Sequence, residues 1–253
     1  MHQTLPATLA PDPGPEIARL ALRFRRANGP VMALINRLGG SVEDRMAMMP
    51  SALRTRIEAV TRAALERGYR LAAGGRHAPD LGPRGPMALA MLTGAAGGAG
   101  GLPTALAELP VTVTVILRAI RRAAAEEGFD PDDPAIRLEA LRVLAAGSPL
   151  AVDDGIDTGF VGARIAVTGP ALQRVLAAAA PRLAAALGQR AMAQAVPVLG
   201  AVAGAGLNAA FIGYYREVAH IRFALLRLAE RHGAARVLAE FGAAAMRPKL
   251  RGA

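Results

Sequence analysis

Glu108 is the first side chain whose surroundings point to chemistry. It is the only charged residue between positions 85 and 117. An acid in such an apolar stretch needs a cationic or polar partner, or else its pKa rises because the charged form is poorly solvated. Glu108 is therefore a candidate ligand-binding or catalytic residue. The alternative is a solvent-facing position in the first turns of a helix that starts at Pro103, where the helix dipole favours an acid.

Asp153, Asp154 and Asp157 form a second, weaker candidate for catalysis, in a loop that contains glycine. No histidine lies near them in the sequence, and we predict no metal site. Three further aspartates occupy the turn over residues 129–134, which lacks the twelve-residue spacing and closing glutamate of a calcium loop. We predict that Asp133 caps a helix beginning at Pro134.

Other kinds of reaction centre are not indicated. The chain has no cysteine, so it has no thiolate nucleophile, disulfide or cysteine-based zinc site. Its serines lie in no nucleophile-elbow motif, and His77, His220 and His232 do not have a metal-ligand spacing. The glycine-rich residues 94–101 lack the Lys-Ser/Thr ending of a phosphate-binding loop. We predict no cofactor, and an enzyme is the least favoured class.

The charge balance indicates an anionic partner. The net charge is +10, with Lys249 as the only lysine, and 53% of the residues are hydrophobic. Nucleic acid is disfavoured because the chain has no tryptophan and only 4% aromatic residues, whereas single-strand binding uses aromatic stacking. An anionic lipid surface fits the charge better, and the alternative is that the arginines, which are spread along many helices, only form solvated faces. The apolar segments would also suit an apolar small molecule.

Apolar spacing predicts a mainly helical chain. Helices are expected after Pro15, after Pro30, over residues 50–68, from Pro103 to Gly128 with a kink or restart at Pro110, from Pro134 to Gly147, and over residues 216–232. Residues 111–116 alternate like a strand, yet no second strand of comparable quality could pair with them. We therefore predict an all-α, multi-helix bundle.

Two glycine-rich segments, residues 85–117, where only Glu108 is charged, and the uncharged residues 191–215, are the main feature of this bundle. Length alone would allow a membrane span, but their glycines and prolines favour helical hairpins jointed at glycine. Arginines flank both segments on both sides, which argues against a one-way crossing. Glycines four residues apart predict close helix packing, in lipid or in protein. The glycines expected to pack are Gly94, Gly98, Gly101, Gly200 and Gly204.

Two blocks of sequence resemble the EcsC family. The first comprises residues 101–110 (GLPTALAELP) and 128–134 (GFDPDDP), and the second comprises residues 195–202 (AVPVLGAV), Gly204, Asn208 and the helix that follows. The resemblance covers residues 50–242 and implies an all-helical domain found beside membranes or membrane transport systems. It implies no established reaction and no catalytic residue. We divide the chain into a leader with short helices (1–45), an EcsC-like domain (46–245) and a basic tail (246–253).

These observations favour a membrane-associated helical protein that engages anionic lipid or an apolar ligand. We expect it to lie at the cytoplasmic face of the membrane, without a cleavable secretion signal and with insertion as an open alternative. The other hypotheses are a soluble interaction module or accessory to a membrane transport protein, and a lipid-acting enzyme. The residues expected to contact lipid or ligand are Glu108, Arg118, Arg122, Asn208, Tyr215, Arg216 and His220.

Overall fold

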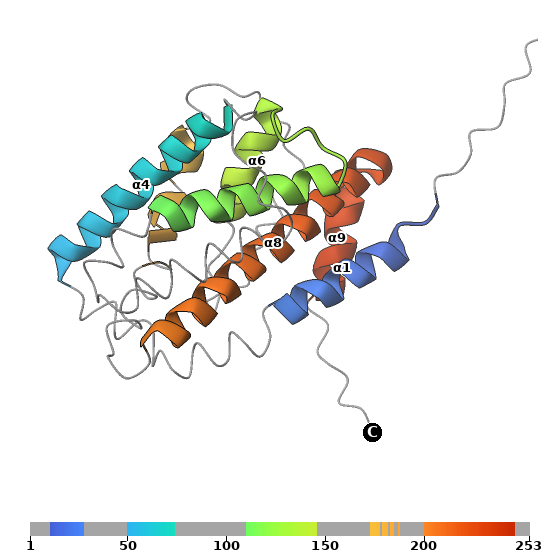
Figure 1. Cartoon of the computed structure of the whole chain (residues 1–253). Coiled ribbons are helices and arrows are strands. Elements are labelled where there is room, and N and C mark those ends of the chain that lie inside the picture. The colour runs from blue at the N-terminus through green and yellow to red at the C-terminus, as the bar shows by residue number, and fades with distance from the viewer. Residues whose placement is uncertain are drawn as a thin grey trace, which may run out of the picture.

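The computed structural model describes residues 11–27, 50–73, 110–145, 173–177, 179–181, 183–184, 187 and 200–245. The named helices are α1 (Gly14–Ala27), α4 (Ser51–Ala73), α6 (Pro134–Ala145), α8 (Gly200–His232) and α9 (Ala234–Ala245). Residues 110–126, called helix 110–126 below, are also helical, and so are the described residues of 173–187. These parts contain no strand, so the predicted all-α bundle is confirmed (Figure 1).

Helix 110–126 resolves the ambiguity at residues 111–116 in favour of helix. Its β-branched residues are tolerated because burial against neighbouring helices outweighs their low helix propensity. Val113, Val115 and Ile116 are all buried. The expected alternation of a strand would have left every second side chain of this stretch outside the core.

Gly128 ends helix 110–126, as predicted. Its φ of 90° lies in the left-handed region that glycine adopts without a Cβ penalty. The N–H of Gly128 donates to the Ala125 carbonyl, and the N–H of Phe129 donates to the Ala124 carbonyl, each at 3.0 Å. This is a Schellman cap, in which the residue after the glycine often makes an apolar contact. Phe129, the residue after the glycine, packs against Phe223 of α8, at a ring-centroid distance of 5.8 Å.

The turn that follows leads directly into α6. The carboxylate of Asp133 accepts a hydrogen bond from the N–H of Ala135 at 2.6 Å, which confirms it as the helix cap. The carboxylate of Asp130 accepts one from the N–H of Asp132 at 2.9 Å. Both hydrogen bonds hold the turn itself, so α6 starts at a fixed angle to helix 110–126.

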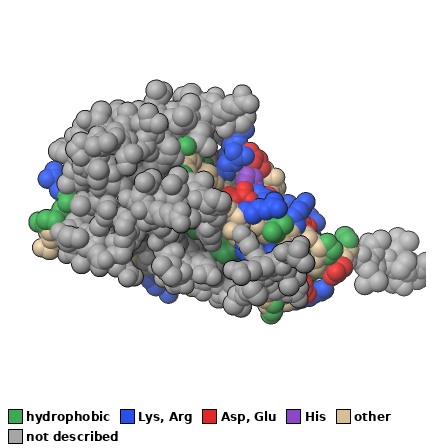
Figure 2. All heavy atoms as spheres, turned by 90° about the horizontal axis from the view of Figure 1, so that it is seen from below, with side chains coloured by type: hydrophobic (Ala, Val, Ile, Leu, Met, Phe, Trp, Pro, Cys, Tyr) green, Lys and Arg blue, Asp and Glu red, His purple; other side chains and the backbone are tan. Residues whose placement is uncertain are grey.

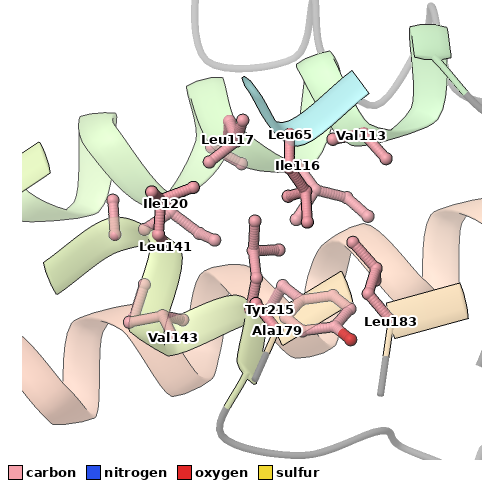
Figure 3. Packing of buried hydrophobic residues seen from close by; sticks show 14 of the residues in the cluster. Leu65, Val113, Ile116, Leu117, Ile120, Leu141, Val143, Ala179, Leu183 and Tyr215 are labelled. Atoms are coloured by element: carbon pink, nitrogen blue, oxygen red, sulfur yellow. The ribbon is translucent and has the colours of Figure 1, made fainter. Parts of the chain in front are cut away.

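The larger hydrophobic cluster joins α4, helix 110–126, α6, residues 173–187 and the first half of α8. In the close view, Leu65, Ile116, Leu141 and Tyr215 point toward one another from four of these segments (Figure 3). Helical spacing predicts Leu138, Leu141 and Leu144 as the inward residues of α6, and all three are buried. For α4 it predicts the stripe Leu53, Ile57, Val60 and Ala64, of which Ile57 and Ala64 are buried. This cluster fixes the relative positions of helix 110–126 and α8.

A smaller cluster joins α1, α9 and the second half of α8. The buried stripe of α1 is the predicted one, and Phe24 packs against Phe241 at a centroid distance of 6.0 Å. Helix α8 takes part in both clusters because its described buried residues run from Phe211 to Ala229. In Figure 1 it runs between helix 110–126 and α1.

The helix α8 corrects one prediction. Residues 200–215 were expected to contain glycine joints, but they form one uninterrupted helix that continues to His232. Burial of Phe211, Ile212 and Tyr215 stabilises the helix and outweighs the low helix propensity of its glycines. Helix α4 also continues past Gly68 to Ala73.

Several predictions lie outside the described residues. They are the helix after Pro30, the 85–109 part of the first glycine-rich segment with Gly94, Gly98 and Gly101, and residues 191–199 of the second. The division into residues 1–45, 46–245 and 246–253 stays a prediction, although α1 packs directly against α8 and α9. In the parts of the chain that are described, no helix combines the length and apolar character needed to cross a membrane.

Candidate functional site

Three of the residues expected to bind a ligand meet around Glu126. Its carboxylate accepts a hydrogen bond from Arg122 Nε at 3.0 Å and lies 3.1 Å from His220 Nε2. The hydrogen bond from Arg122, followed by the charges of His220, Arg216 and Arg122, lowers the pKa of Glu126. Arg118 lies one helical turn before Arg122, so both lie on the same helix face. We call Arg118, Arg122 and Arg216 the arginine edge.

Tyr215, in contrast, lies in the larger hydrophobic cluster and is almost fully buried. Burial raises the pKa of its phenol and raises the pKa of the neighbouring Tyr214 to about 12. The two rings meet edge to face at a centroid distance of 5.4 Å. Both side chains therefore contribute to packing in this structure.

The remaining predicted site residues cannot be located in the same detail. Glu108, Asp153, Asp154 and Asp157 lie outside the described residues. Gly200, Gly204 and Asn208 belong to α8, but the structure does not describe their side-chain positions. Their proposed roles in catalysis, packing or binding stay predictions.

Glu127, next to Glu126, links helix 110–126 to α8 and α1. One carboxylate oxygen lies 3.1 Å from His220 Nδ1, and the other accepts a hydrogen bond from Arg227 Nη1 at 2.8 Å. Arg227 Nη2 donates to Glu16 of α1 at 2.9 Å. A continuous series of hydrogen-bonded and ion-paired side chains thus runs from α1 through α8 to helix 110–126.

This series has a local electrostatic reason. Glu126 and Glu127 lie at the C-terminal end of helix 110–126, where the helix dipole disfavours negative charge. Arg227 of α8 offsets that cost at Glu127, and His220 Nε2 lies within hydrogen-bonding distance of Glu126. The acidic pair therefore fixes where α8 contacts this helix end.

A bidentate ion pair connects α1 to the same region of α8. Arg23 donates to both carboxylate oxygens of Glu217, at 2.6 and 3.0 Å. The hydrogen bond to Glu217 raises the pKa of Arg23 despite desolvation, and the charges of Glu217 and Glu127 add to the effect. Because Glu16 pairs with Arg227 and Arg23 pairs with Glu217, α1 and α8 run antiparallel.

A third ionic contact is buried between α6 and α8. Arg222 Nε donates to Glu139, and Arg142 Nη1 lies 3.4 Å from the other oxygen of that carboxylate. Arg222 and Glu139 side chains are only 7% and 10% exposed. This contact fixes the register of two helices inside the protein and is poorly placed to meet a ligand.

The arrangement is better suited to electrostatic binding than to catalysis. Both ring nitrogens of His220 face carboxylates, so neither is directed at an open position where it could take a proton from a substrate. No group of histidine, aspartate and glutamate side chains within the described parts of the chain could hold a metal ion. On the face seen in Figure 2, basic, acidic and histidine side chains lie close together.

Sequence reasoning missed the acidic partners of this site. Glu126 and Glu127 were not singled out, and neither were Glu16, Glu217 or Arg227. One local signal was available in the sequence: two acids directly precede the glycine that ends a predicted helix. Acids at the C-terminal end of a helix are disfavoured by the helix dipole, so they require nearby cations. The identity of those cations could not be read from the sequence, since they lie about a hundred residues further along the chain.

Comparison with known proteins supports the first block of the resemblance. Residues 84–152 match the model of the EcsC protein family. They contain helix 110–126, the Gly128 cap and α6, and therefore both acids at the centre of the site. The second block, from Ala195 onward, lies outside the matched residues. No curated protein and no solved structure matches the chain. The match over residues 84–152 agrees with the resemblance to the EcsC protein family that the sequence predicted.

Proposed function

We propose that the protein is a peripheral membrane protein that binds anionic lipid headgroups at the arginine edge. The observation that carries this proposal is the hydrogen bond from Arg122 to Glu126, together with the charge of Arg216, which also lowers the pKa of that carboxylate, and with Arg118 one turn before Arg122. Arg118 and Arg216 are exposed. Among the described side chains, Arg216 interacts with Glu126 only through its charge, so both exposed guanidinium groups can reach phosphate oxygens.

The apolar face of the basic helix is not available for this contact. Val218, Ile221, Leu225 and Leu228 form the expected stripe of residues 216–232, and all four are buried in the two clusters. A surface helix that inserts into lipid needs an exposed apolar face. Binding in this fold must therefore depend on the outward-facing charges and on small apolar contacts beside them.

Val111 supplies one such apolar contact. Its side chain is 39% exposed and lies seven residues before Arg118, on the same face of helix 110–126. Arginine attracts anionic lipid with about 1 kcal/mol per residue near a membrane surface, and the attraction weakens with salt. We therefore expect reversible, salt-sensitive binding that does not require a helix to cross the bilayer.

Vesicle sedimentation with the full chain tests the proposal. Vesicles of phosphatidylcholine alone are compared with vesicles that also contain phosphatidylglycerol, over a series of rising salt concentrations. The protein should sediment with the anionic vesicles and be released as the salt rises, because screening shortens the reach of its charges. Absence from the anionic vesicles at low salt would contradict the proposal.

A pair of matched variants locates the contact. The double substitution R118Q/R216Q should weaken anionic binding by up to about thirtyfold, from about 1 kcal/mol for each arginine. The control R56Q/R67Q removes the same charge from exposed positions on α4. It should have a smaller effect, because only the overall field of the protein changes. Equal losses in the two variants would show that net charge, and not this edge, directs binding.

A further inference from the structure

The outward face of α1 carries an exposed leucine between two arginines. Leu22 is 40% exposed and, apart from Val111, is the only large apolar side chain exposed in the described parts of the chain. It lies opposite the buried stripe formed by Ile17, Leu20 and Phe24. The surface of α1 that faces away from the protein is therefore not purely polar.

Arg19 and Arg26 flank Leu22 on that face, three residues before it and four residues after it. Both are exposed. Arg19 has only a distant contact with Glu16, at 3.8 Å, and Glu16 is already held by Arg227 at 2.9 Å. The other exposed residues of this face are Pro15 and Ala18, so it carries no acid. Its charge is consequently uncompensated, unlike that of Arg23.

The same helix is tied to the arginine edge. Arg23 of α1 holds Glu217 with two hydrogen bonds, and Glu217 is the direct neighbour of Arg216. The apolar stripe of α1 and the contact of Arg25 with the Ala244 carbonyl, at 2.8 Å, fix the helix on α8 and α9. The face that carries Leu22 is thus held in one orientation relative to the arginine edge.

We propose that Arg19, Leu22 and Arg26 form a second contact with the anionic bilayer. This proposal rests on the proposed function. Leucine gains a favourable environment at the boundary between headgroups and acyl chains, while the long arginine side chains reach back to the phosphates. A single leucine offers too little area for a stable protein interface, which buries hundreds of square ångströms on each partner. The bilayer is therefore the partner that this face fits.

Tryptophan fluorescence gives a direct readout, because the chain has no tryptophan of its own. The variant L22W places the indole on the proposed contact. The control A239W places it on the exposed face of α9, where Arg236 is paired with Asp12 and Glu240. With vesicles that contain phosphatidylglycerol, emission of L22W should shift to shorter wavelength and be quenched by brominated lipid, and that of A239W should not.

Sedimentation of the same samples separates the two proposals. If L22W sediments with anionic vesicles but its emission does not change, the α1 contact is overturned while lipid binding stands. If it does not sediment, lipid binding itself fails and the α1 contact fails with it. A shift that appears without vesicles as protein concentration rises would assign this face to a second copy of the chain and overturn the proposal.

A second variant measures the contribution of the leucine without adding a large ring. L22S removes the apolar contact and leaves the charge unchanged. The side chain of Leu22 is already partly exposed to water in the folded protein. It should weaken binding to anionic vesicles by about fivefold, because the exposed part of one leucine no longer leaves water. The control A239S should bind like the unmodified protein. Identical binding of L22S and A239S would contradict a role for Leu22.

Discussion

Arg227 donates a hydrogen bond to Glu127 across a hundred positions of sequence, with 2.8 Å between Nη1 and Oε2. The other terminal nitrogen of the same guanidinium donates to Glu16 at 2.9 Å. The planar fork of arginine suits this task, because it can serve two carboxylates in fixed directions. One side chain of α8 thereby connects α1 with the end of helix 110–126.

Replacing Arg227 by methionine should lower the free energy of unfolding by about 2 kcal/mol. The methionine keeps much of the apolar stem, but it leaves two partly buried carboxylates without their cation. The side chains of Glu127 and Arg227 are 14% and 30% exposed, so solvent screens this interaction only in part. Urea unfolding followed by circular dichroism measures the change.

The matched control is R236M. Arg236 also pairs with two acids on two segments, Asp12 and Glu240, but it is half exposed. Exposed ion pairs contribute little, so the loss should be much smaller than that of R227M. If R227M and R236M lowered stability equally, burial would not distinguish the two networks and our interpretation of Glu127 would be wrong.

The buried contact of Glu139 with Arg222 gives a second prediction. Changing Glu139 to glutamine removes the carboxylate charge that faces the desolvated guanidinium of Arg222, so stability should fall by about 3 kcal/mol. In the double variant E139L/R222M no charge of this pair remains, and part of the loss should be recovered. Urea unfolding of E139L, R222M and E139L/R222M, beside the unmodified chain, completes a double-mutant cycle. Additive losses would show that the two side chains act independently.

The parts of the fold that depend on neighbouring residues could be predicted from the sequence. The buried stripe of α1, the cap by Asp133 and the stop at Gly128 need only helical spacing and local hydrogen bonds. The helix over residues 111–116 followed from the lack of a partner strand. These features have short-range causes, which one sequence reveals.

The continuity of α8 and the partners of Glu126 and Glu127 have long-range causes. The glycines of residues 200–213 indicate joints when considered alone, and only the burial of residues such as Phe211 and Tyr215 explains an uninterrupted helix. The pairing of Glu127 with Arg227 depends on the register between two helices, which packing in the larger cluster sets. Arg122 and His220 could be selected as site residues from the sequence. The carboxylate of Glu126 between them was missed, because its contact with His220 depends on the same register.

The glycines differ in what they contribute, and alanine substitution should show it. Gly128 has a φ of 90°, so G128A forces a side chain into the left-handed region and should cost about 1 to 2 kcal/mol. Gly213 lies inside α8, and a Cβ there would meet nothing within 4 Å. G213A should therefore stabilise the protein by up to about 1 kcal/mol, because alanine has the higher helix propensity. Thermal unfolding of both variants checks that the two changes in stability have opposite signs. Destabilisation by G213A would contradict the open space beside Gly213 in α8.

Alkaline pH should destabilise the protein through its buried tyrosines. Burial raises the pKa of Tyr214 to about 12 and raises that of Tyr215 further, so the folded protein keeps both phenols protonated when unfolded tyrosines ionise near pH 10. Their protonation contributes fully to stability below about pH 10, and the contribution is lost as the pH rises toward 12. For Tyr214 alone this amounts to about 3 kcal/mol at most, since one pKa unit corresponds to about 1.4 kcal/mol.

The substitution Y214F/Y215F tests this origin. Phenylalanine has no proton to lose, so the free energy of unfolding of this variant, measured in urea from about pH 9 to 12, should fall much less than that of the unmodified chain. The chain has no cysteine, and its single lysine and Tyr69 are present in both proteins, so their contributions cancel in the comparison. A parallel decline in the two proteins would place the alkaline loss elsewhere and would contradict the buried, protonated state of Tyr214 and Tyr215.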